Sequence, residues 1–553
     1  MQVGKLLRWA LLPLVLTMFV FGTVSNCVAA PSSDATLTDR ESAIQTGTQL
    51  EKSRQWLDAI EHYEAGIESW PDSKDLEYGL RRSKIQFGID RRYVDASYEH
   101  VLLNKSRSQS LRLFSQVLYH VQANYVVPIS STTFVAHGTE SLYLALSNRK
   151  FLAFHLPNAD PSRIARMRKI LKDEYWNKPV ANSTAAGSTL AQVCDRAGDL
   201  LGLSSSAVIM EYVFGGCNAL DDYSSCLTPD RNTDLQGNID GNFVGLGIEM
   251  RAESGKGMLL VNVLPTSPAE EGGMLPGDWI VLIDGKDCRN MTTDEAAKLL
   301  RGTVGSRVRL SLVTPTADDG EAPRRRENTF VRRHVEVKSI PVAEIVDAQH
   351  GIAYIQMNGF QKSTPSELDA ALQKLRARGM RSLIWDVRGN PGGLLNGAAE
   401  VLDRFIDRGV LVSTRGRTQD HNDVFTAYRQ RTWNMPLVLL IDGDSASASE
   451  IVAGALRDHK RGTIVGRKTY GKWSVQNIFR LNDNIGLRLT TAKFYSPNGE
   501  NLSKIGLEPD VEVPKLAERR TYYRGSRRAG ASADSDADLK RGIELLRGQL
   551  TRR

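Results

Sequence analysis

The spacing of hydrophobic and polar residues takes three forms along this chain. Over residues 40–150, apolar side chains recur every three or four positions, which predicts amphipathic helices such as Ser110–Tyr125. Pro157–Gly202 is also predicted to be helical, but it is polar. From Asn242 onward, short apolar runs separated by glycine turns predict a small β-rich domain. From Gly351 onward, strand-length apolar runs alternate with helical segments, which predicts a layered α/β core.

Individual elements can be assigned in the second half of the chain. In the β-rich segment we expect strands at Met258–Val263, Ile280–Ile283 and Arg307–Val313, and a helix at Thr293–Leu300. The Arg-rich stretch Pro315–Asn328 is expected to be a loop or an extended hairpin. The α/β segment should contain strands at Ile352–Met357, Ser382–Val387, Pro436–Ile441, Thr463–Val465 and Ile485–Thr491, and helices at Pro365–Arg376, Leu395–Phe405 and Glu450–Arg457.

The C-terminal tail changes composition. Ala529–Asp538 is small, polar and acidic, which is typical of a disordered segment. Leu539–Leu550 regains apolar periodicity and predicts a final helix.

The N-terminus has the features of an export signal. Lys5 and Arg8 precede the apolar run Trp9–Gly22, and the following Cys27-Val28-Ala29-Ala30 ends like a cleavage site. Three interpretations stay open: a cleaved signal, a lipid on Cys27, and an uncleaved anchor running to about Ala30. All three put the bulk of the chain outside the cytoplasm, in the periplasm or cell envelope, and the last two attach it to the membrane.

Composition excludes several classes of protein. Hydrophobic residues make up 41% and charged residues 24% of 553, close to the globular average, so the chain is neither wholly disordered nor fibrous. A single apolar stretch of near-membrane length excludes a multi-span transporter. The net charge of +7 reflects arginine clusters at 324–333 and 519–528. Because no basic helix with interleaved aromatics accompanies them, we expect a solvated loop and tail and no nucleic-acid binding.

The five cysteines do not have the spacing of a metal site. The sequence has no CxxC pair and no Cys/His set with zinc spacing, so we expect neither a metal nor another cofactor. Cys217 and Cys226 are close enough in sequence to close a loop by a disulfide in an oxidising compartment. Buried free thiols explain these two residues equally well.

One helical segment has the spacing of a repeat motif. Ala59, Tyr63, Gly66 and Pro71 fall where a tetratricopeptide second helix has its signature residues. A single unit of this kind cannot bury its own apolar face. A plain helical hairpin packed on the next segment and a repeat that binds a helper or adaptor protein therefore stay as alternatives.

A serine-rich turn follows the predicted strand Pro436–Ile441. It presents Ser445, Ser447 and Ser449 at the N-terminus of a helix, where free N–H groups and the helix dipole favour developing negative charge. This arrangement suits a nucleophile. It is equally the pattern of a capping box, in which Ser447 and Glu450 only begin the helix.

A nucleophilic serine requires a base. His459 lies twelve residues along the same predicted helix, roughly 18 Å away at 1.5 Å per residue, so it cannot reach Ser447. Lys472 lies beyond the next strand, so the chain can return it to the start of the helix. Shielding from water lowers the pKa of a lysine, which can then accept a serine proton.

The β-rich segment resembles a PDZ domain. The resemblance rests on the loop Gly245-Leu246-Gly247-Ile248, the turn Pro276-Gly277-Asp278 and the helix Thr293–Leu300, which occur in the family's order. It implies that the C-terminus of a partner adds as a strand beside Ile248, with its carboxylate on the N–H groups of Gly245–Gly247. Arg301, directly after the helix, could then pair with the substrate or with the catalytic domain.

The serine and lysine segments resemble the carboxyl-terminal processing proteases, also called tail-specific proteases. The matching residues are Ser447-Ala448-Ser449-Glu450, Gly471-Lys472-Trp473-Ser474-Val475-Gln476 and Asp386-Val387-Arg388-Gly389-Asn390-Pro391-Gly392-Gly393. The resemblance implies that Ser447 is the nucleophile, Lys472 the general base and Gln476 the residue that orients the lysine. It also implies an oxyanion hole formed by the N–H groups of Gly393 and Ala448.

The resemblance covers roughly residues 105–515 and implies a multidomain fold. We expect a leader (1–30), a tetratricopeptide-like helical region (31–105), a helical N-terminal part of the protease (106–240), a PDZ domain (241–336), an α/β crotonase-like catalytic domain (337–515) and a charged tail (516–553). Trp473 departs from the family, which has a small residue there, and could narrow the substrate channel.

These patterns predict an exported serine endopeptidase with a Ser447/Lys472 dyad. Its partners would be proteins with apolar C-termini, captured by the PDZ domain and cleaved without a metal or cofactor. The main alternative is a catalytically silent PDZ/helical scaffold that binds peptide C-termini. A crotonase-like acyl enzyme is the second alternative, but an export signal and a PDZ domain do not suit a thioester substrate.

Overall fold

The computed structural model describes residues 39–253, 255–315, 323–514 and 536–551. The export signal and the arginine cluster at 519–528 lie outside these ranges. The chain divides into two compact units, residues 39–233 with 476–491 and residues 234–475 with 492–551. Among the described residues, no helix is long and apolar enough to cross a membrane, and no three His, Cys, Asp or Glu side chains gather as a metal site would require.

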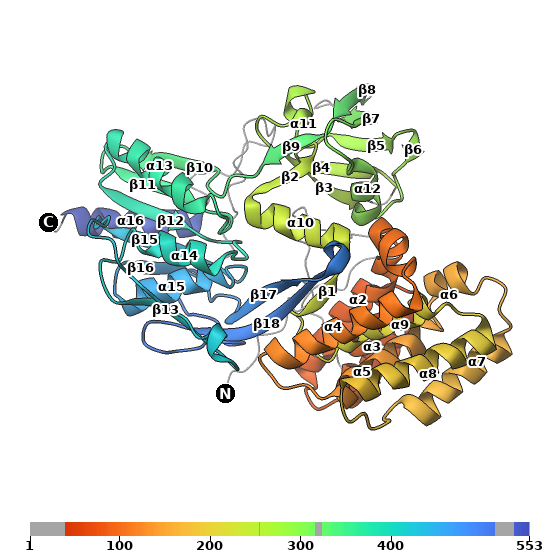
Figure 1. Ribbon diagram of the computed structural model, residues 1–553. Coiled ribbons are helices and arrows are strands. Elements are labelled where there is room, and N and C mark those ends of the chain that lie inside the picture. The colour runs from red at the N-terminus through yellow and green to blue at the C-terminus, as the bar shows by residue number, and fades with distance from the viewer. Residues whose placement is uncertain (1–38, 254, 316–322, 515–535, 552–553) are drawn as a thin grey trace. The chain divides into compact units, whose positions relative to one another are not determined.

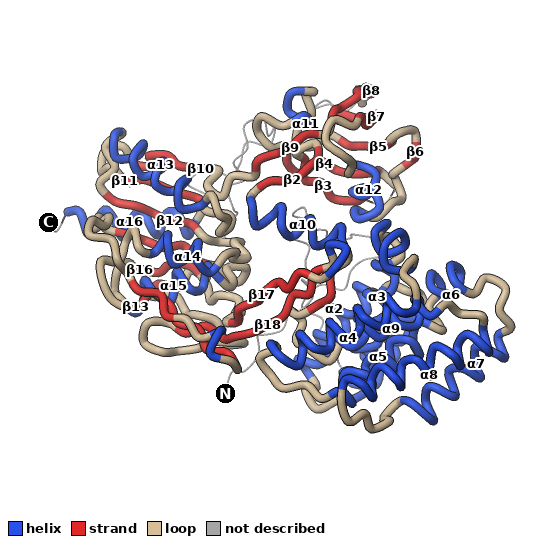
Figure 2. Tube along the Cα trace, in the orientation of Figure 1, coloured by secondary structure: helices blue, strands red, loops and turns tan. Residues whose placement is uncertain are grey.

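The first unit begins with three packed helices, drawn in blue in Figure 2. These are α1 (Arg40–Lys52), α2 (Trp56–Ser69) and α3 (Lys74–Arg92). The buried Tyr63 ring lies against Gly47 and Gly79, where an added Cβ atom would stand only 2.4 Å from the ring. The two glycines therefore let α1 and α3 approach α2 closely.

The rest of this unit is a helical core with a β-hairpin. Phe114, Leu142 and Tyr212 are wholly buried in that core. The helices are η1 (Tyr98–Leu103), α4 (Arg107–Asn124), α5 (Ser131–Ala145), α6 (Arg149–His155), α7 (Pro161–Ile170), η2 (Leu171–Tyr175), α8 (Ser183–Leu201) and α9 (Ser205–Cys217). Helix α10 (Pro229–Asp240) begins in this unit, and its residues from Asp234 onward belong to the second unit. Strand β1 (Ser225–Leu227) pairs with the start of β18 (Gly486–Tyr495), which pairs with β17 (Ser474–Arg480) across η4 (Asn482–Asn484).

Cys217 and Cys226 are both buried, and both thiols are free. Of the two sequence-based interpretations, the structure therefore has the free thiols and not the loop-closing disulfide. Burial raises the pKa of Cys217 to about 12, because a thiolate at this position would lose its hydration.

The β-rich part of the second unit is a sheet of order β3-β4-β5-β7-β8 with one principal helix. Helix α12 (Thr293–Leu300) has the predicted bounds, because Thr292 and Glu295 form a capping box at its start. The elements are β2 (Asn242–Gly245), β3 (Ile248–Glu253), β4 (Gly257–Val263), α11 (Pro268–Glu271), β5 (Trp279–Ile283), β6 (Lys286–Asp287), α12, β7 (Arg307–Thr314), β8 (Arg324–Val331) and β9 (Arg333–Glu336).

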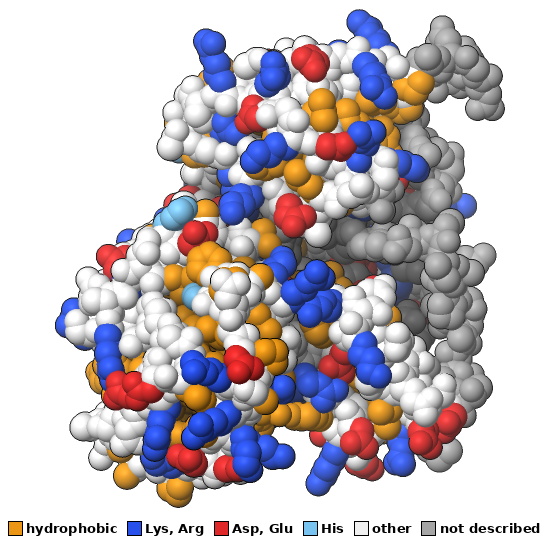
Figure 3. Space-filling model, turned by 90° about the vertical axis from the view of Figure 1, so that its right-hand side faces the viewer, with side chains coloured by type: hydrophobic (Ala, Val, Ile, Leu, Met, Phe, Trp, Pro, Cys, Tyr) orange, Lys and Arg blue, Asp and Glu red, His pale blue; other side chains and the backbone are white. Residues whose placement is uncertain are grey.

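The arginine cluster at 324–333 does not form the expected solvated loop. Residues 324–331 form β8, which pairs antiparallel with β7, so the extended-hairpin alternative is correct. Arg332 is only 5% exposed and donates to the carbonyls of Leu299 and Leu300. Several arginines of this cluster therefore bind partners within the domain: Arg332 binds these carbonyls, Arg326 pairs with Asp278 and Arg333 pairs with Glu271. On the face drawn in Figure 3, Lys and Arg side chains are interspersed with Asp and Glu.

The α/β part of the second unit is built on a six-stranded sheet of order β10-β11-β12-β15-β16-β19. All neighbouring strands are parallel except β10 and β11. Its strands are β10 (Val342–Asp347), β11 (Ile352–Gln356), β12 (Ser382–Asp386), β15 (Leu437–Ile441), β16 (Thr463–Gly466) and β19 (Val511–Glu512). Strand β13 (Val410–Gly416) pairs with β14 (Val424–Thr426), near η3 (Gln419–His421), and with the end of β18.

Helices cover both faces of this sheet (Figure 1). Trp385 and Leu439 pack in the core with α13 (Thr364–Ala377), α14 (Leu395–Leu402) and α15 (Ala448–Asp458). Their strand neighbours Ile384 and Val438 pack on the opposite face with Leu539 and Leu546 of α16 (Ala537–Thr551). The continuous apolar strand sequences arise because both faces are buried.

The prediction of a disordered segment at Ala529–Asp538 is wrong for its last residues. Residues 529–535 lie outside the described ranges, but Asp536 and Asp538 are completely buried. Both carboxylates form ion pairs with Arg388, and Asp538 also pairs with Arg467. An acidic composition predicts solvation only where no buried cation is available.

Candidate active site

The turn between β15 and α15 holds Ser447 in a strained backbone conformation. Its φ is 56° and its ψ is −113°, a region that residues with a side chain rarely occupy. Ser447 is half-buried at the N-cap of α15, whose first turn offers backbone N–H groups. A strained serine at a helix N-terminus is the arrangement expected of a nucleophile.

A second turn, residues 386–393, is hydrogen-bonded to this serine turn. The carbonyl of Asn390 accepts hydrogen bonds from Ala446 N (3.0 Å) and Ser449 Oγ (2.9 Å). In the other direction, Gly389 N donates to Asp442 Oδ1 at 2.8 Å. The two glycine- and serine-rich segments, more than fifty residues apart in sequence, therefore form one rigid structure.

The predicted oxyanion residues lie at this junction. A Cβ atom on Gly392 would stand 2.7 Å from Ser447 Cβ and 2.8 Å from Ala448 N, so only glycine permits the close approach. Gly393 has a φ of 147° and forms a β-bridge with Phe360. Within the described part of the chain, the N–H groups of Gly393 and Ala448 have no hydrogen-bond acceptor. Both remain available to an anion.

Glu450 connects the serine turn to the lysine segment. Its carboxylate is buried, and its Oε2 accepts hydrogen bonds from Ser447 N (2.9 Å) and Lys472 N (2.8 Å). Its Oε1 accepts from Gly471 N and Thr469 Oγ1, both at 2.7 Å. The capping pattern predicted the bond to Ser447 but not the bonds to residues 469–472.

Burial and hydrogen bonding shift the pKa of the Glu450 carboxyl in opposite directions. Burial raises the pKa of Glu450 above its usual value, because an ionised carboxylate loses hydration in the core. The donors from Thr469, Gly471, Ser447 and Lys472 oppose this shift. Together with Trp473 Nε1, five donors are directed at the two oxygens, which suits the charged form and fixes the backbones of Ser447 and Lys472 relative to each other.

Lys472 is half-buried at this junction, two residues before the start of β17. Strand β17 also carries Gln476, whose Nε2 donates to Thr490 Oγ1 at 3.4 Å. The structure thus brings the backbone of the predicted base segment to the start of α15 through the Glu450 carboxylate.

Trp473 does not occupy a substrate channel, contrary to the sequence-based expectation. The residue is 1% exposed, and its ring stacks on Phe494 with 4.8 Å between centroids. Its Nε1 lies 3.2 Å from Glu450 Oε1 and donates to it. The side chain therefore supports the anchoring carboxylate from within the core.

His459 is excluded as a base by the observed helix. Helix α15 is continuous from Ala448 to Asp458, so His459 lies at the opposite end from Ser447. Its Nε2 contacts the carbonyl oxygen of Val410 at 2.7 Å, and the ring is half-buried. His459 therefore caps the end of the helix and is not a simple surface residue.

The predicted peptide-binding residues Leu246, Gly247 and Ile248 lie at the start of β3, which forms one edge of the β-rich sheet. Leu246 and Ile248 are buried, and Ile248 begins β3 opposite Val263 of β4. Gly247 has a φ of 78°, and its carbonyl accepts from Leu264 N at 2.8 Å. Within the described chain, β3 pairs with β4 alone and ends its sheet, so its outer edge offers backbone groups to an added strand.

Gly245 and Arg301 have partners outside the β-rich sheet. Gly245 is the last residue of β2 and pairs with Arg333 of β9, so the expected glycine loop begins inside a strand. Arg301 follows α12, and its Nη2 pairs with Asp234 of α10 at 2.9 Å. The structure thus gives Arg301 a partner in the helix that precedes the β-rich domain.

Comparisons with known proteins identify both domains of the second unit. Residues 351–513 match Peptidase family S41, and residues 260–314 match a PDZ domain. A carboxy-terminal-processing protease of Bartonella bacilliformis is 34% identical over 362 residues, 60% of this chain and 81% of that protein. The carboxy-terminal processing protease CtpA of Bacillus subtilis is 30% identical over 338 residues, 60% of this chain and 70% of its own length.

A solved structure gives a further match. The photosystem II D1 C-terminal processing protease corresponds to 78% of this chain and 99% of its own, at 24% identity and a TM-score of 0.41.

Proposed function

The chain belongs to the carboxyl-terminal-processing protease family, and from this premise we propose that it is an endopeptidase whose nucleophile is Ser447 and whose general base is Lys472. The observation that carries this assignment is the Glu450 carboxylate, which accepts hydrogen bonds from the backbones of both residues. A serine-type peptidase requires such a fixed pair, because the proton must leave the hydroxyl as the bond to the substrate forms.

The proposed reaction uses the groups at the junction of the two turns. Ser447 Oγ attacks the scissile carbonyl and transfers its proton to Lys472 Nζ, while Gln476 orients the lysine. The N–H groups of Gly393 and Ala448 stabilise the oxyanion, and Lys472 then protonates the departing amine. Water releases the acyl group from Ser447 by the same steps in reverse order. The chemistry uses no metal or cofactor.

Substrate capture is proposed to occur at the edge of β3. The substrates of a protease with a PDZ domain are proteins, and we propose that an apolar C-terminus extends the sheet beside Ile248. The terminal carboxylate would bind the N–H groups of residues 245–247. Arg301, now paired with Asp234, would exchange partners when a substrate is bound.

The remaining features of the chain receive more general proposals. We propose export to the periplasm or cell envelope, because a basic residue pair precedes the apolar run 9–22. We propose that α1–α3 form a tetratricopeptide-like unit that binds a helper protein, and that the catalytic region, residues 337–515, has crotonase-like layering. The boundaries 1–30, 31–105, 106–240, 241–336 and 516–553 are proposed for the other parts.

The silent scaffold is the less favoured alternative. A scaffold gains nothing from a strained serine, two available N–H groups and a buried carboxylate that joins them to a lysine segment. Casein turnover by the purified chain should be lost in Ser447→Ala, while binding of a peptide C-terminus is retained. Turnover unchanged by Ser447→Ala would exclude the proposed nucleophile.

A further inference from the structure

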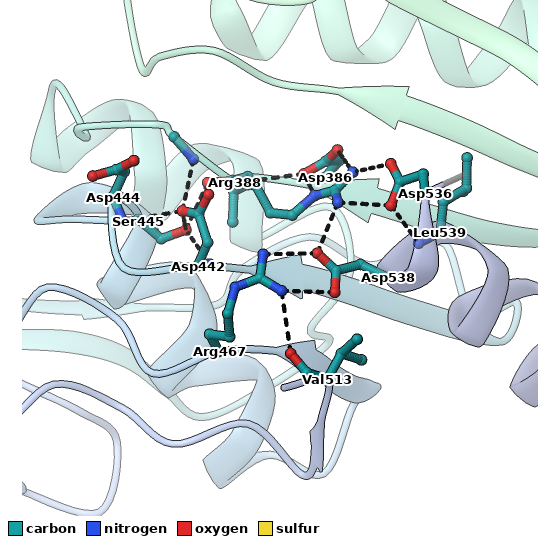
Figure 4. A network of polar contacts seen from close by, with 12 residues as sticks. Asp386, Arg388, Asp442, Asp444, Ser445, Arg467, Val513, Asp536, Asp538 and Leu539 are labelled. Atoms are coloured by element: carbon teal, nitrogen blue, oxygen red, sulfur yellow. Dashed lines mark hydrogen bonds and ion pairs between the residues drawn. The ribbon is translucent and has the colours of Figure 1, made fainter. Parts of the chain in front are cut away.

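Arg388 lies in the turn that bears the oxyanion glycines, and its guanidinium is completely enclosed by carboxylates (Figure 4). Its Nε and Nη2 donate to Asp386 at 3.0 and 2.7 Å. Its Nη1 and Nη2 donate to Asp536 at 2.9 and 2.8 Å, and Nη1 also donates to Asp538 at 2.8 Å. All five N–H bonds of the side chain are therefore directed at a carboxylate oxygen.

Two of these three carboxylates come from the distant C-terminal helix. Asp536 and Asp538 lie at the start of α16, about 150 residues after Arg388 in sequence. Arg467, directly after β16, holds Asp538 from the other side through two bonds of 2.9 and 2.8 Å. Side-chain exposure is 2% for Arg388 and at most 1% for Asp386, Asp536 and Asp538.

The charged contact is separate from the apolar contact that attaches α16 to the sheet. Leu539 and Leu546 are fully buried against Ile384 and Val438, which already provides the hydrophobic stabilisation of a docked helix. Buried ion pairs add little net stability, because desolvation offsets their attraction, but they fix geometry when fully hydrogen-bonded. The two aspartates therefore act on the orientation of Arg388 more than on the attachment of α16.

The backbone that follows Arg388 contacts the serine turn of the proposed hydrolytic site directly. The next residue, Gly389, donates its N–H to Asp442 in the serine turn, and Asn390 accepts from Ala446 and Ser449. Gly392 then contacts Ser447, and Gly393 follows. A rotation of Arg388 would thus move the N–H groups intended for the oxyanion relative to the nucleophile.

We propose that Asp536 and Asp538 of the C-terminal helix are positioning residues for hydrolysis, which hold Arg388 and through it the oxyanion turn 389–393. This inference rests on the proposed roles of Ser447, Gly393 and Ala448. It makes the docked start of α16 a required part of the hydrolytic site, although no residue of α16 contacts the reacting atoms.

The full-length chain carrying Asp536→Asn and Asp538→Asn tests this proposal. Misplacing the turn should lower kcat for a peptide substrate about 10- to 100-fold with KM changed less than about twofold, because the defect lies in transition-state stabilisation. Glu544→Gln on the exposed side of the same helix is the matched control and should retain the wild-type kcat. Leu546→Ala should lower the melting temperature while leaving kcat near wild type below that temperature.

The opposite pattern would overturn the proposal. If the aspartate variants lose melting temperature as Leu546→Ala does but keep kcat per folded molecule, the network is only structural. Arg388→Ala provides a second measurement: added methylguanidinium should restore part of kcat, and it should fail to do so when Asp536 and Asp538 are also asparagine. Equal restoration in both backgrounds contradicts the role of α16. Activity that survives Ser447→Ala would instead refute the underlying site.

Discussion

The backbone N–H of Lys472 donates to Glu450 Oε2 at 2.8 Å, and the same oxygen accepts the N–H of Ser447 at 2.9 Å. One buried oxygen thus joins two segments that lie 25 residues apart in sequence. The bond to Ser447 begins a helix, as a capping box does. The bond to Lys472 converts that helix start into a fixed point for the proposed base.

Glu450→Gln should reduce activity strongly. The amide would present an NH2 group to at least one pair of N–H donors, so buried donors would lose their acceptor at about 1–3 kcal/mol each. We expect kcat to fall about 10²-fold, because the backbones of Ser447 and Lys472 would separate. Kinetics on the folded variant measure this loss. Glu500→Gln, an exposed partner of Arg457, is the control, and an active Glu450→Gln would show that the bridge is dispensable.

The sequence predicted most of the secondary structure because local signals dominate there. The predicted helix Thr293–Leu300 is observed with the same bounds, and the continuous apolar runs at 382–387 and 436–441 became central strands. Capping residues, turn glycines and the continuous apolar runs of strands buried on both faces can each be recognised from a few neighbouring residues. The segments that contain Ser447 and Lys472 were identified for the same reason.

What the sequence could not predict depends on partners distant in the chain. Asp536 and Asp538 have an acidic local composition, and only the fold brings Arg388 and Arg467 to them. Arg332 likewise resembles a solvated cation until the carbonyls of Leu299 and Leu300 enclose it. Burial of a charged side chain can be predicted only when its partner is known, and local composition gives no information on a partner that is distant in sequence.

Trp473→Ala should destabilise the protein without widening its cleavage preference. The ring is buried against Phe494, so its removal should cost about 3–5 kcal/mol of unfolding free energy. Denaturant unfolding measures the loss, and Tyr428→Ala, which truncates an exposed ring, should be nearly neutral. A stable Trp473→Ala variant that accepts bulkier substrates would restore the channel interpretation.

Tail recognition predicts a difference between a peptide acid and its amide. In the proposed capture the outer edge of β3 would bind the peptide backbone, but only a carboxylate could use the N–H groups proposed at 245–247. Amidating the C-terminus of an apolar peptide should therefore raise KM at least about tenfold, since 1.4 kcal/mol of lost binding has this effect. Cleavage assays with matched acid and amide peptides measure it; equal KM values would contradict carboxylate capture.

The thiol of Cys217 should react slowly in the folded protein. With its pKa raised to about 12, the reactive thiolate at pH 8 should be about 10³-fold rarer than in an ordinary cysteine. Because the folded pKa exceeds the unfolded one, this thiol also lowers stability as pH rises through the interval between the two values. Alkylation with and without denaturant, followed by mass measurement, tests the slow reaction, and denaturant unfolding at increasing pH tests the loss of stability. Resistance to alkylation in denaturant without a reductant would indicate a disulfide to Cys226.

Two substitutions distinguish Lys472 from His459 as the general base. Lys472→Arg preserves the positive charge, but a guanidinium does not deprotonate in this pH range, so the variant should fold, bind peptide and fail to hydrolyse it. His459→Ala should keep most activity and lose about 1 kcal/mol of stability, because the ring only contacts the Val410 carbonyl at the far end of α15. A lysine base also predicts that activity rises with pH above the range of histidine, since the amine must lose its proton before it can accept another from Ser447. Peptide hydrolysis by the two folded variants across this range decides the matter. An inactive His459→Ala together with an active Lys472→Arg would require a different path for the proton, through a helix that the structure shows to be unbroken.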